Sequence, residues 1–202
     1  MSTETSYKPT TDEIKRLREE TGAGIADCRA ALVASAGDFA AARKGLIEAG
    51  GAKAAKKSER VASEGLVGQY VHVGGKIGVL VEVNCETDFV ARNERFSQLV
   101  RDVAMHIAAM PVEYVSRDDV PEERLAALRA EFTSGLAPEK RAFAEKIVEG
   151  KLGKWFEEHV LLEQPFIKND ERTVGQLVSE LVGVLGEKIA VRRFAKFTLG
   201  AP

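Results

Sequence analysis

The chain lacks the features that mark an exported, membrane-spanning or disulfide-bonded protein. No apolar run approaches the roughly 20 residues that a helix needs to cross a bilayer, and the opening segment MSTETSYKPT has neither a basic start nor an apolar stretch. Only two cysteines occur, Cys28 and Cys85, and neither belongs to a CxxC pair or has a histidine at metal-ligand spacing. We therefore expect a cytoplasmic protein with reduced thiols, no membrane segment and no bound metal.

A strong excess of charge of either sign is also missing. The 29 basic and 31 acidic residues give a net charge of −2, and residues 1–64 hold 11 Lys or Arg against 10 Asp or Glu. The most basic part of the chain therefore sums to +1, which leaves −3 for the remainder. Tight binding to phosphates needs a concentrated basic surface, so we expect no direct contact with nucleic acid. The basic run at residues 53–60 fits a solvated helical linker better than an RNA-contacting strip, because acidic residues interrupt and flank it.

The side chains that enzymes use for covalent chemistry are present but scattered. His72, His106 and His159 lie far apart in the sequence, and neither an HExxH nor a GxSxG motif occurs. Cys85, the best candidate nucleophile, alternates with two valines, so we expect a buried and inert strand residue. The turn at residues 21–24 follows a helical pattern and lacks the Gly-Lys-Ser/Thr ending of a phosphate loop. We predict neither covalent catalysis nor a cofactor.

The most informative stretch is NCETDFVARN, residues 84–93, where a strand pattern changes into a helix pattern. Upstream, apolar residues recur with the period of two that is typical of a half-buried strand, at Val79, Val81, Val83 and Cys85. Downstream, they recur at threes and fours like one face of an amphipathic helix, at Phe96, Leu99, Val100, Val103 and Ile107. The change of period places a strand-to-helix corner within this stretch.

The corner itself carries an aromatic residue with two possible roles. Thr87 and Asp88 are both residue types that accept hydrogen bonds from the first amides of a helix. Phe89 follows them and falls outside the apolar stripe of the downstream helix. From spacing alone, Phe89 is either a core aromatic beneath a helix cap or a side chain presented to a partner.

Periodicity before residue 50 predicts three short helices. Thr11 or Asp12 is expected to cap the first, the glycines of the turn at residues 21–24 break it, and Gly37 ends the second. Apolar residues at threes and fours after Gly37 predict the third helix. We therefore predict a compact three-helix module at the N-terminal end.

The rest of the chain mixes strand and helix patterns. Two β-rich runs, residues 65–73 and 76–85, are joined by two glycines, a pair that readily adopts the positive φ angles of a tight hairpin. Helical patterns follow, with Pro121 and Pro138 at the expected first positions of two helices. A last β-rich run at residues 189–199 would complete a three-stranded sheet with helices on one face.

These patterns predict an α+β protein in three parts. An N-terminal three-helix module occupies residues 1–50 and a helical or extended linker occupies residues 51–64. An α+β core at residues 65–202 contains the small antiparallel sheet and its helices.

Several separated segments resemble the bacterial elongation factor Ts family. The central one is TDFV, residues 87–90, with VEVNCE before it and ARNERF after it. The others are LREETGAGIADCRAAL, GAKAAKK, LLEQPF, GEKIAVRRF and FTLG, which occur in this order around the central motif and extend the resemblance from about residue 11 to residue 200. Ordered, separated motifs are far more specific than any one of them. The chain resembles the short, single-core members of the family.

The resemblance implies guanine-nucleotide exchange on elongation factor Tu. By the match, Phe89 is an apolar wedge that enters beside the Mg²⁺ site of the partner, and Asp88 fixes the loop and adds polar contacts. Thr87 would hold the turn, and Val90 would support the wedge from behind. The chain would bind the GDP-bound and the nucleotide-free partner, without a cofactor or a metal of its own.

A second contact and a dimer are also implied. The N-terminal module would have a ubiquitin-associated-like fold and touch the partner through Arg18, Ile25 and Ala26, although from the residues alone Ile25 fits the module core equally well. Some relatives carry methionines at the last two positions, and Ala26 is smaller than the methionine that it matches. Short members of the family pair as homodimers, which would let two small sheets cover each other's edges.

Two other classes of function compete with nucleotide exchange. A non-exchanging helical adaptor, or a ribosome-associated binding protein, would work through the N-terminal module and would tolerate loss of the Phe89 ring. An RNA chaperone would bind with a steep salt dependence, which the near-neutral charge disfavours.

Overall fold

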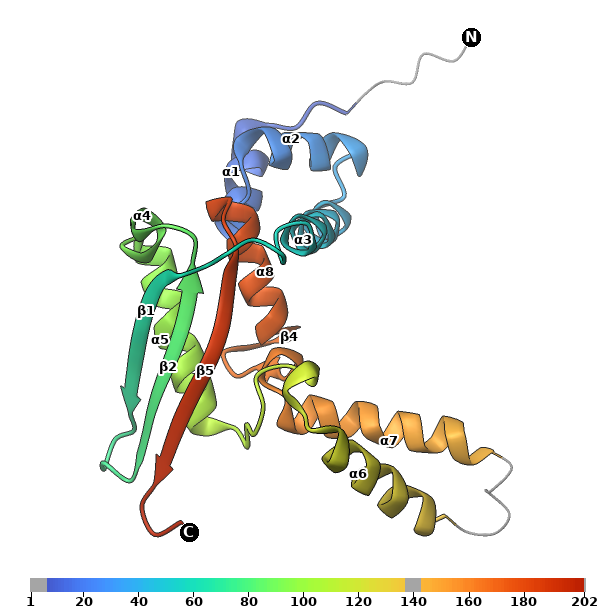
Figure 1. Ribbon diagram of the computed structural model, residues 1–202. Helices are drawn as coiled ribbons and strands as arrows, with labels where there is room; N and C mark the ends of the chain where they lie inside the picture. Colours follow the sequence, from blue (N-terminus) through green and yellow to red (C-terminus); the bar gives the residue numbers. More distant parts are fainter. Residues whose placement is uncertain (1–6, 137–142, 202) are drawn as a thin grey trace. The chain divides into compact units, whose positions relative to one another are not determined.

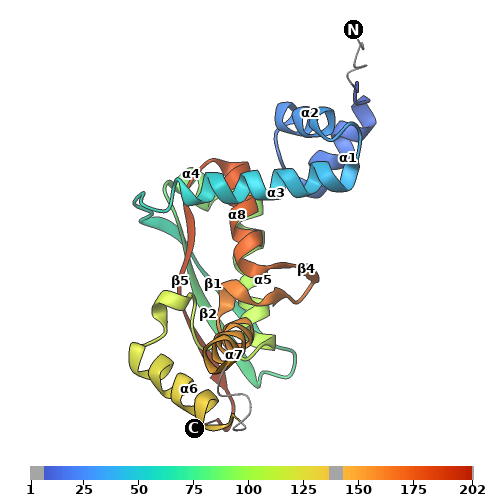
Figure 2. The same cartoon turned by 90° about the vertical axis from the view of Figure 1, so that its right-hand side faces the viewer.

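A computed structural model of the chain describes residues 7–136 and 143–201. The predicted α+β class is confirmed, because helices combine with a small antiparallel sheet (Figures 1 and 2). In chain order the elements are α1 (Thr11–Thr21), α2 (Ile25–Ala34), α3 (Phe39–Ala55), β1 (Glu64–Val71), β2 (Ile77–Cys85), α4 (Asp88–Ala91), α5 (Glu94–Ala109), the 3-10 helix η1 (Arg117–Asp119), α6 (Glu122–Ser134), α7 (Ala144–His159), the 3-10 helix η3 (Leu161–Glu163), β3 (Pro165–Phe166), β4 (Asn169–Thr173), α8 (Val174–Leu185) and β5 (Ile189–Thr198).

The described residues divide into two compact units. The first unit comprises residues 7–66, 83–99 and 176–190. The second comprises residues 67–82, 100–136, 143–175 and 191–201. The helix expected to begin at Pro138 starts outside the described residues. Within the parts of the chain that the structure covers, no helix combines the length and the apolar character needed to cross a bilayer.

The three helices predicted at the N-terminal end are confirmed, with a different cap. Thr10, rather than Thr11 or Asp12, is the N-cap of α1. The Thr10 side chain accepts a hydrogen bond from the Glu13 N–H, and the Glu13 carboxylate accepts one from the Thr10 N–H at 2.7 Å. This reciprocal pair needs an acidic residue three positions after the cap, which only Thr10 has. The three helices enclose a small buried core made by Leu17, Cys28, Leu32 and Ala42.

The predicted hairpin and its glycine turn are also confirmed. The three-stranded sheet has the order β1-β2-β5, and Gly74 and Gly75 have φ angles of 93° and 68° in the turn between β1 and β2. The His72 N–H donates to the Ile77 carbonyl at 2.9 Å just before this turn. The alternating residues of β2 are buried, namely Val79, Val81, Val83 and Cys85, and so are Phe96, Leu99, Val100, Val103 and Ile107 on α5, which runs alongside the sheet (Figures 1 and 2).

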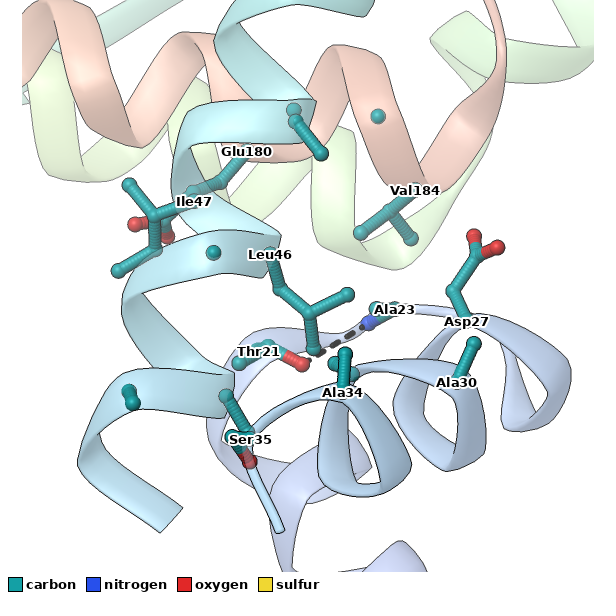
Figure 3. A pocket seen from close by; sticks show the side chains of 17 residues that line it. Thr21, Ala23, Asp27, Ala30, Ala34, Ser35, Leu46, Ile47, Glu180 and Val184 are labelled. Atoms are coloured by element: carbon teal, nitrogen blue, oxygen red, sulfur yellow. Dashed lines mark hydrogen bonds between the residues drawn. The ribbon is translucent and has the colours of Figure 1, made fainter. Parts of the chain in front are cut away.

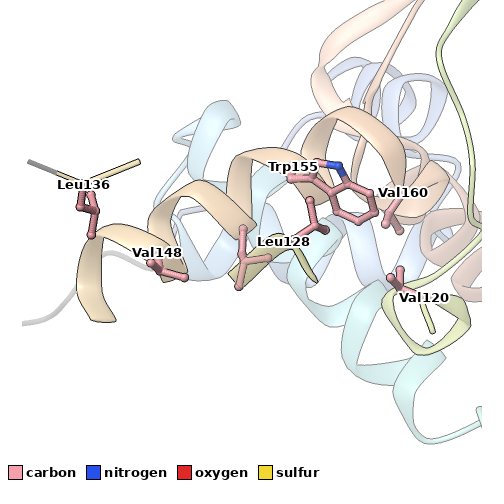
Figure 4. Packing of buried hydrophobic residues seen from close by; sticks show 7 residues of the cluster. Val120, Leu128, Leu136, Val148, Trp155 and Val160 are labelled. Atoms are coloured by element: carbon pink, nitrogen blue, oxygen red, sulfur yellow. The ribbon is translucent and has the colours of Figure 1, made fainter. Parts of the chain in front are cut away.

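Helices α6 and α7 form a hairpin with a hydrophobic cluster of its own in the second unit. Figure 4 shows Trp155 near Leu128 and Val160 in this cluster. The Trp155 ring lies edge-on to Phe156 at 5.7 Å and stacks on His159 at 4.7 Å, measured between ring centroids. Such aromatic pairs add to the stabilisation that comes from burial alone.

Two local expectations for the second unit need correction. Pro121 is the N-cap of α6 and not its first residue, because its ψ of 139° is not helical. The short hairpin of β3 and β4 was not predicted, since the strand NDERT has no apolar alternation.

Candidate functional site

Thr87 turns the end of strand β2 into the one-turn helix α4. Its φ and ψ angles of −130° and 157° are extended, and its side chain accepts a hydrogen bond from the Val90 N–H at 3.4 Å. The Ala91 N–H donates to the Thr87 carbonyl at 3.1 Å and closes the turn. Of the two N-cap types in the sequence, Thr87 is therefore the cap, and Asp88 is the first helical residue.

The side chains of α4 differ sharply in exposure. Phe89 is 80% exposed, whereas Val90 is only 9% exposed. Because consecutive helical residues point about 100° apart, the turn directs Phe89 outward while Val90 lies against the protein beneath it. Burying a Phe ring stabilises a fold by about 1.5–3 kcal/mol, and this chain forgoes that gain at Phe89. The core interpretation of Phe89 is therefore wrong.

Asp88 is partly exposed and forms an ion pair. Its carboxylate lies 3.0 Å from the Arg92 guanidinium, one helical turn later. Exposed pairs at this spacing contribute little to stability because water and salt screen them. The Asp88 carboxylate thus remains partly accessible to solvent.

A carboxylate from a distant segment supports the corner. Glu187, in the turn between α8 and β5, accepts hydrogen bonds from the Thr87 hydroxyl at 2.6 Å and from the Thr87 and Glu86 amides at 3.0 and 3.2 Å. In return, the Glu86 carboxylate accepts the Lys188 N–H at 2.6 Å. That hydrogen bond, assisted by the nearby positive charge of Arg60, lowers the pKa of Glu86. Sequence reasoning missed the role of Glu187, although it lies in the matched segment GEKIAVRRF.

Cys85 is not a nucleophile at this corner. Its side chain is fully buried, and its thiol donates a hydrogen bond to the Thr87 carbonyl at 3.2 Å. Burial, together with the negative charge of Glu187, raises the pKa of Cys85 to about 11. The thiol is therefore protonated at neutral pH, as expected for an inert strand residue.

The residues predicted for partner contact on the N-terminal module lie at the end of α1 and the start of α2. Arg18 and Ala26 are exposed, and Ile25 is 58% exposed. The alternative that Ile25 is a core residue is therefore wrong. Gly22, between the two helices, has a φ of 69°, and a Cβ there would lie 2.9 Å from both the Arg95 and Val184 side chains. Only glycine fits this close approach without a shift.

The residues predicted on α4 and those predicted on the N-terminal module occupy separate elements, and neither set lines a sizeable groove in the first unit. This groove of about 640 Å³ is lined by residues of α2, α3 and α8, including Leu46 and Val184 (Figure 3). Its walls are rich in alanine and glycine, and of the described residues, neither those of α4 nor Ile25 and Ala26 belong to its lining. We therefore place the candidate site on the exposed corner and not in the groove.

The three histidines do not come together. The His72 ring bonds to the Tyr70 hydroxyl at 3.1 Å, His106 bonds to Gln164 at 2.8 Å, and His159 stacks on Trp155. Across residues 7–136 and 143–201, no three His, Cys, Asp or Glu side chains gather in a way that could hold a metal ion. The arrangement that remains is a polar corner carrying one exposed aromatic ring, which is suited to recognition of another protein.

Comparison with known proteins finds similarity to the elongation factor Ts family. A family model described as elongation factor TS matches residues 8–201. A protein named elongation factor Ts from Anaeromyxobacter sp. (strain Fw109-5) is 51% identical over 93% of this chain and 86% of its own length. The protein of that name from Moorella thermoacetica is 53% identical over 93% and 94%. The one from Thermosynechococcus vestitus is 54% identical over 93% of this chain but 64% of its own length.

Proposed function

Because this chain belongs to the elongation factor Ts family, we propose that it acts in translation as a guanine-nucleotide exchange factor for elongation factor Tu. The observation that carries the proposal is the exposed Phe89 ring on a corner whose backbone is fixed by hydrogen bonds. A large apolar side chain held outward gains free energy when a partner covers it. The proposed site of action is the cytoplasm.

Exchange requires no covalent chemistry. A factor that binds the nucleotide-free partner more tightly than the GDP-bound partner weakens nucleotide binding by the same ratio, because the two binding equilibria are coupled. In this proposal Phe89 inserts beside the Mg²⁺ and phosphate site of the partner, and Asp88 provides polar contacts there. Displacing the divalent ion removes an important part of what holds the phosphates of GDP. The metal belongs to the partner throughout.

Thr87 and Val90, the other two residues of the TDFV loop, maintain its conformation. Thr87 caps α4 and keeps the turn closed, while the buried Val90 supports the base of Phe89. An ordered loop loses less conformational entropy on binding than a mobile one, so the partner contact is stronger. Arg18, Ile25 and Ala26 provide a second, independent contact with the partner in this proposal.

We also infer a homodimer, because the outer face of the sheet carries exposed apolar side chains. A Cβ at Gly68 of β1 would meet the Val100 side chain of α5, so this side of β1 faces the helix. Val67 and Val71, one and three positions away, therefore face outward, and both are exposed. Leu80 of β2 is likewise exposed between buried neighbours. A second copy of the chain would cover this apolar face.

The proposal is tested by the release of fluorescent GDP from elongation factor Tu in excess unlabelled nucleotide. We expect strong acceleration by the unaltered chain and loss of most of it with Phe89→Ala. Phe143→Ala is the matched control, because Phe143 is also an exposed phenylalanine, at 66% exposure, and lies at the start of α7. Acceleration that persists in the Phe89 variant would contradict the proposed role of the loop. Binding to elongation factor Tu without any acceleration would favour the adaptor function instead.

A further inference from the structure

The turn between α8 and β5 reaches the Phe89 corner through a single carboxylate. Both oxygens of Glu187 accept hydrogen bonds: one from the Thr87 hydroxyl at 2.6 Å, the other from the Thr87 and Glu86 amides at 3.0 and 3.2 Å. The acceptor and its donors are 100 or 101 positions apart in sequence. The contact is thus a tertiary bond between two turns and not a local capping interaction.

The second turn is itself fixed in place. The Lys188 amide donates to the Glu86 carboxylate at 2.6 Å, so the two turns exchange hydrogen bonds in both directions. The Lys188 ammonium donates to the carbonyls of Ser58 and Arg60 at 2.6 and 2.8 Å. Glu187 therefore acts from an anchored backbone, and its carboxylate can restrain the position of Thr87.

Only an ionised carboxylate satisfies all three donors of the corner. An ionised Glu accepts at two oxygens and donates at none, whereas a Gln amide accepts at one position only. Hydrogen bonds to a charged acceptor are stronger than those between neutral groups, and losing such an acceptor leaves partly buried donors unpaired. Removing the Glu187 side chain would free the Thr87 hydroxyl and two consecutive amides immediately before α4.

We propose that Glu187 is a positioning residue for nucleotide exchange: it fixes Thr87, the cap of α4, and thereby holds Phe89 in the orientation that acts on the partner. This inference rests on the proposed exchange function and adds to it a residue outside the TDFV loop. Glu187 need not contact the partner. It acts through the geometry of the corner, so its loss affects the step that the Phe89 ring promotes more than the initial encounter through the N-terminal module.

The test uses the full chain with Glu187→Ala, Glu187→Gln and a matched control, Asp119→Asn. Asp119 accepts hydrogen bonds from the Ser116 amide and hydroxyl at 2.8 and 2.7 Å, so it has the same types of donor, but in a local cap of the second unit. Urea unfolding of each variant checks that it is folded. Should Glu187→Ala fail to fold, Glu187→Gln, which retains one acceptor oxygen, takes its place.

The main measurement is the rate of fluorescent GDP release from elongation factor Tu at increasing concentrations of each variant. We expect Glu187→Ala to lower the maximal rate about tenfold, and to change the half-saturating concentration less than about twofold. Glu187→Gln should give an intermediate rate, and Asp119→Asn should match the unaltered chain. A general loss of structure would not separate the maximal rate from half-saturation in this way.

Two further measurements show whether Glu187 acts through Phe89. In the Phe89→Ala background, Glu187→Ala should lower the maximal rate of GDP release only slightly further, because the ring that Glu187 positions is gone. Amide hydrogen exchange of the free protein should be faster at Thr87 in Glu187→Ala and unchanged there in Asp119→Asn. Full additivity of the two substitutions, or an unchanged maximal rate with Glu187→Ala, would overturn the inference. If the unaltered chain itself fails to accelerate release, the exchange function is overturned first, and the functional role of Glu187 falls with it.

Discussion

The α4 corner of the first unit and the α6–α7 hairpin of the second use aromatic side chains in opposite ways. In the hairpin, Trp155 is buried and in contact with the rings of Phe156 and His159. At the corner, Phe89 is exposed, while hydrogen bonds beneath it fix the backbone through Thr87. The first arrangement stabilises the fold, and the second leaves a ring available for a partner. Burial of Trp155 therefore contributes to the stability of the hairpin, whereas Phe89 fills no core and is free for the partner contact that we propose.

The largest expected effect is on stability, at the hairpin. Trp155→Ala removes a buried ring and leaves a cavity, so the free energy of unfolding should fall by about 3–5 kcal/mol. Urea denaturation followed by circular dichroism measures this change. Phe143→Ala removes an exposed ring from the start of the same helix and should stay within about 0.5 kcal/mol of the unaltered chain. Similar losses for both variants would remove the distinction between buried and exposed rings.

The second effect is at the corner, where a substitution should change nucleotide exchange and not stability. Phe89→Ala should change the free energy of unfolding by less than about 0.5 kcal/mol, because the ring is already in water. The same substitution should lower the rate of GDP release about 30-fold or more, as for a central residue of a protein interface. Both quantities are measured on one preparation. A stability loss comparable to that of Trp155→Ala would show that Phe89 is part of the core after all.

A third effect is a pH dependence of stability in the second unit. His106 is fully buried, its Nδ1 accepts the Ile167 N–H at 3.3 Å, and its Nε2 bonds to the Gln164 side chain. Burial lowers the pKa of His106 below its ordinary value of 6.5. Below pH 6.5 the unfolded chain therefore binds a proton at His106 more readily than the folded chain does. The free energy of unfolding should keep the full contribution of neutral His106 above pH 6.5 and decline as the pH falls below that value.

Urea denaturation between pH 7.5 and pH 5, values on the order of one unit either side of an ordinary histidine pKa, measures this decline. His106→Gln should flatten it, whereas His72→Gln, at an exposed position, should leave it unchanged. Equal slopes for the unaltered chain and His106→Gln would show that other groups cause the acid sensitivity.

The smallest effect concerns the surface ion pair at the corner. Arg92→Ala removes the partner of Asp88 but should change the free energy of unfolding by less than about 0.5 kcal/mol, because Arg92 is largely exposed and Asp88 is partly exposed. Any loss should shrink further at high salt, which screens exposed charges. A loss above about 1 kcal/mol would contradict the view that the corner is held by Glu187 and the Thr87 cap.

Local patterns in the sequence predicted most of the corner. The period of two in β2 and the period of three to four in α5 located the joint, and the N-cap preferences of threonine and aspartate limited the cap of α4 to Thr87 or Asp88. The exposure of Phe89 could not be derived from spacing alone, since most phenylalanines are buried. The family resemblance supplied that expectation, and the structure agrees with it.

What the sequence could not predict depends on long-range contacts or on weak local signals. Glu187 meets Thr87 across 100 residues, and no periodicity indicates which of 31 acidic residues makes that contact. The polar strand β4 has no apolar alternation, so nothing marked it as a strand. The cap at Thr10 was missed by one residue, although its Glu at the third helical position is a recognisable signal. The proposed boundaries at residues 50 and 64 remain predictions.

The central claim is that Phe89 makes the chain bind nucleotide-free elongation factor Tu more tightly than the GDP-bound form. The most direct measurement is the dissociation constant of each complex, for the unaltered chain and for Phe89→Ala, by isothermal titration. We predict that the unaltered chain prefers the nucleotide-free partner by at least about tenfold, and that Phe89→Ala loses most of this preference. Equal affinities of the unaltered chain for both forms would contradict the account, because a factor without that difference leaves the affinity of the partner for GDP unchanged.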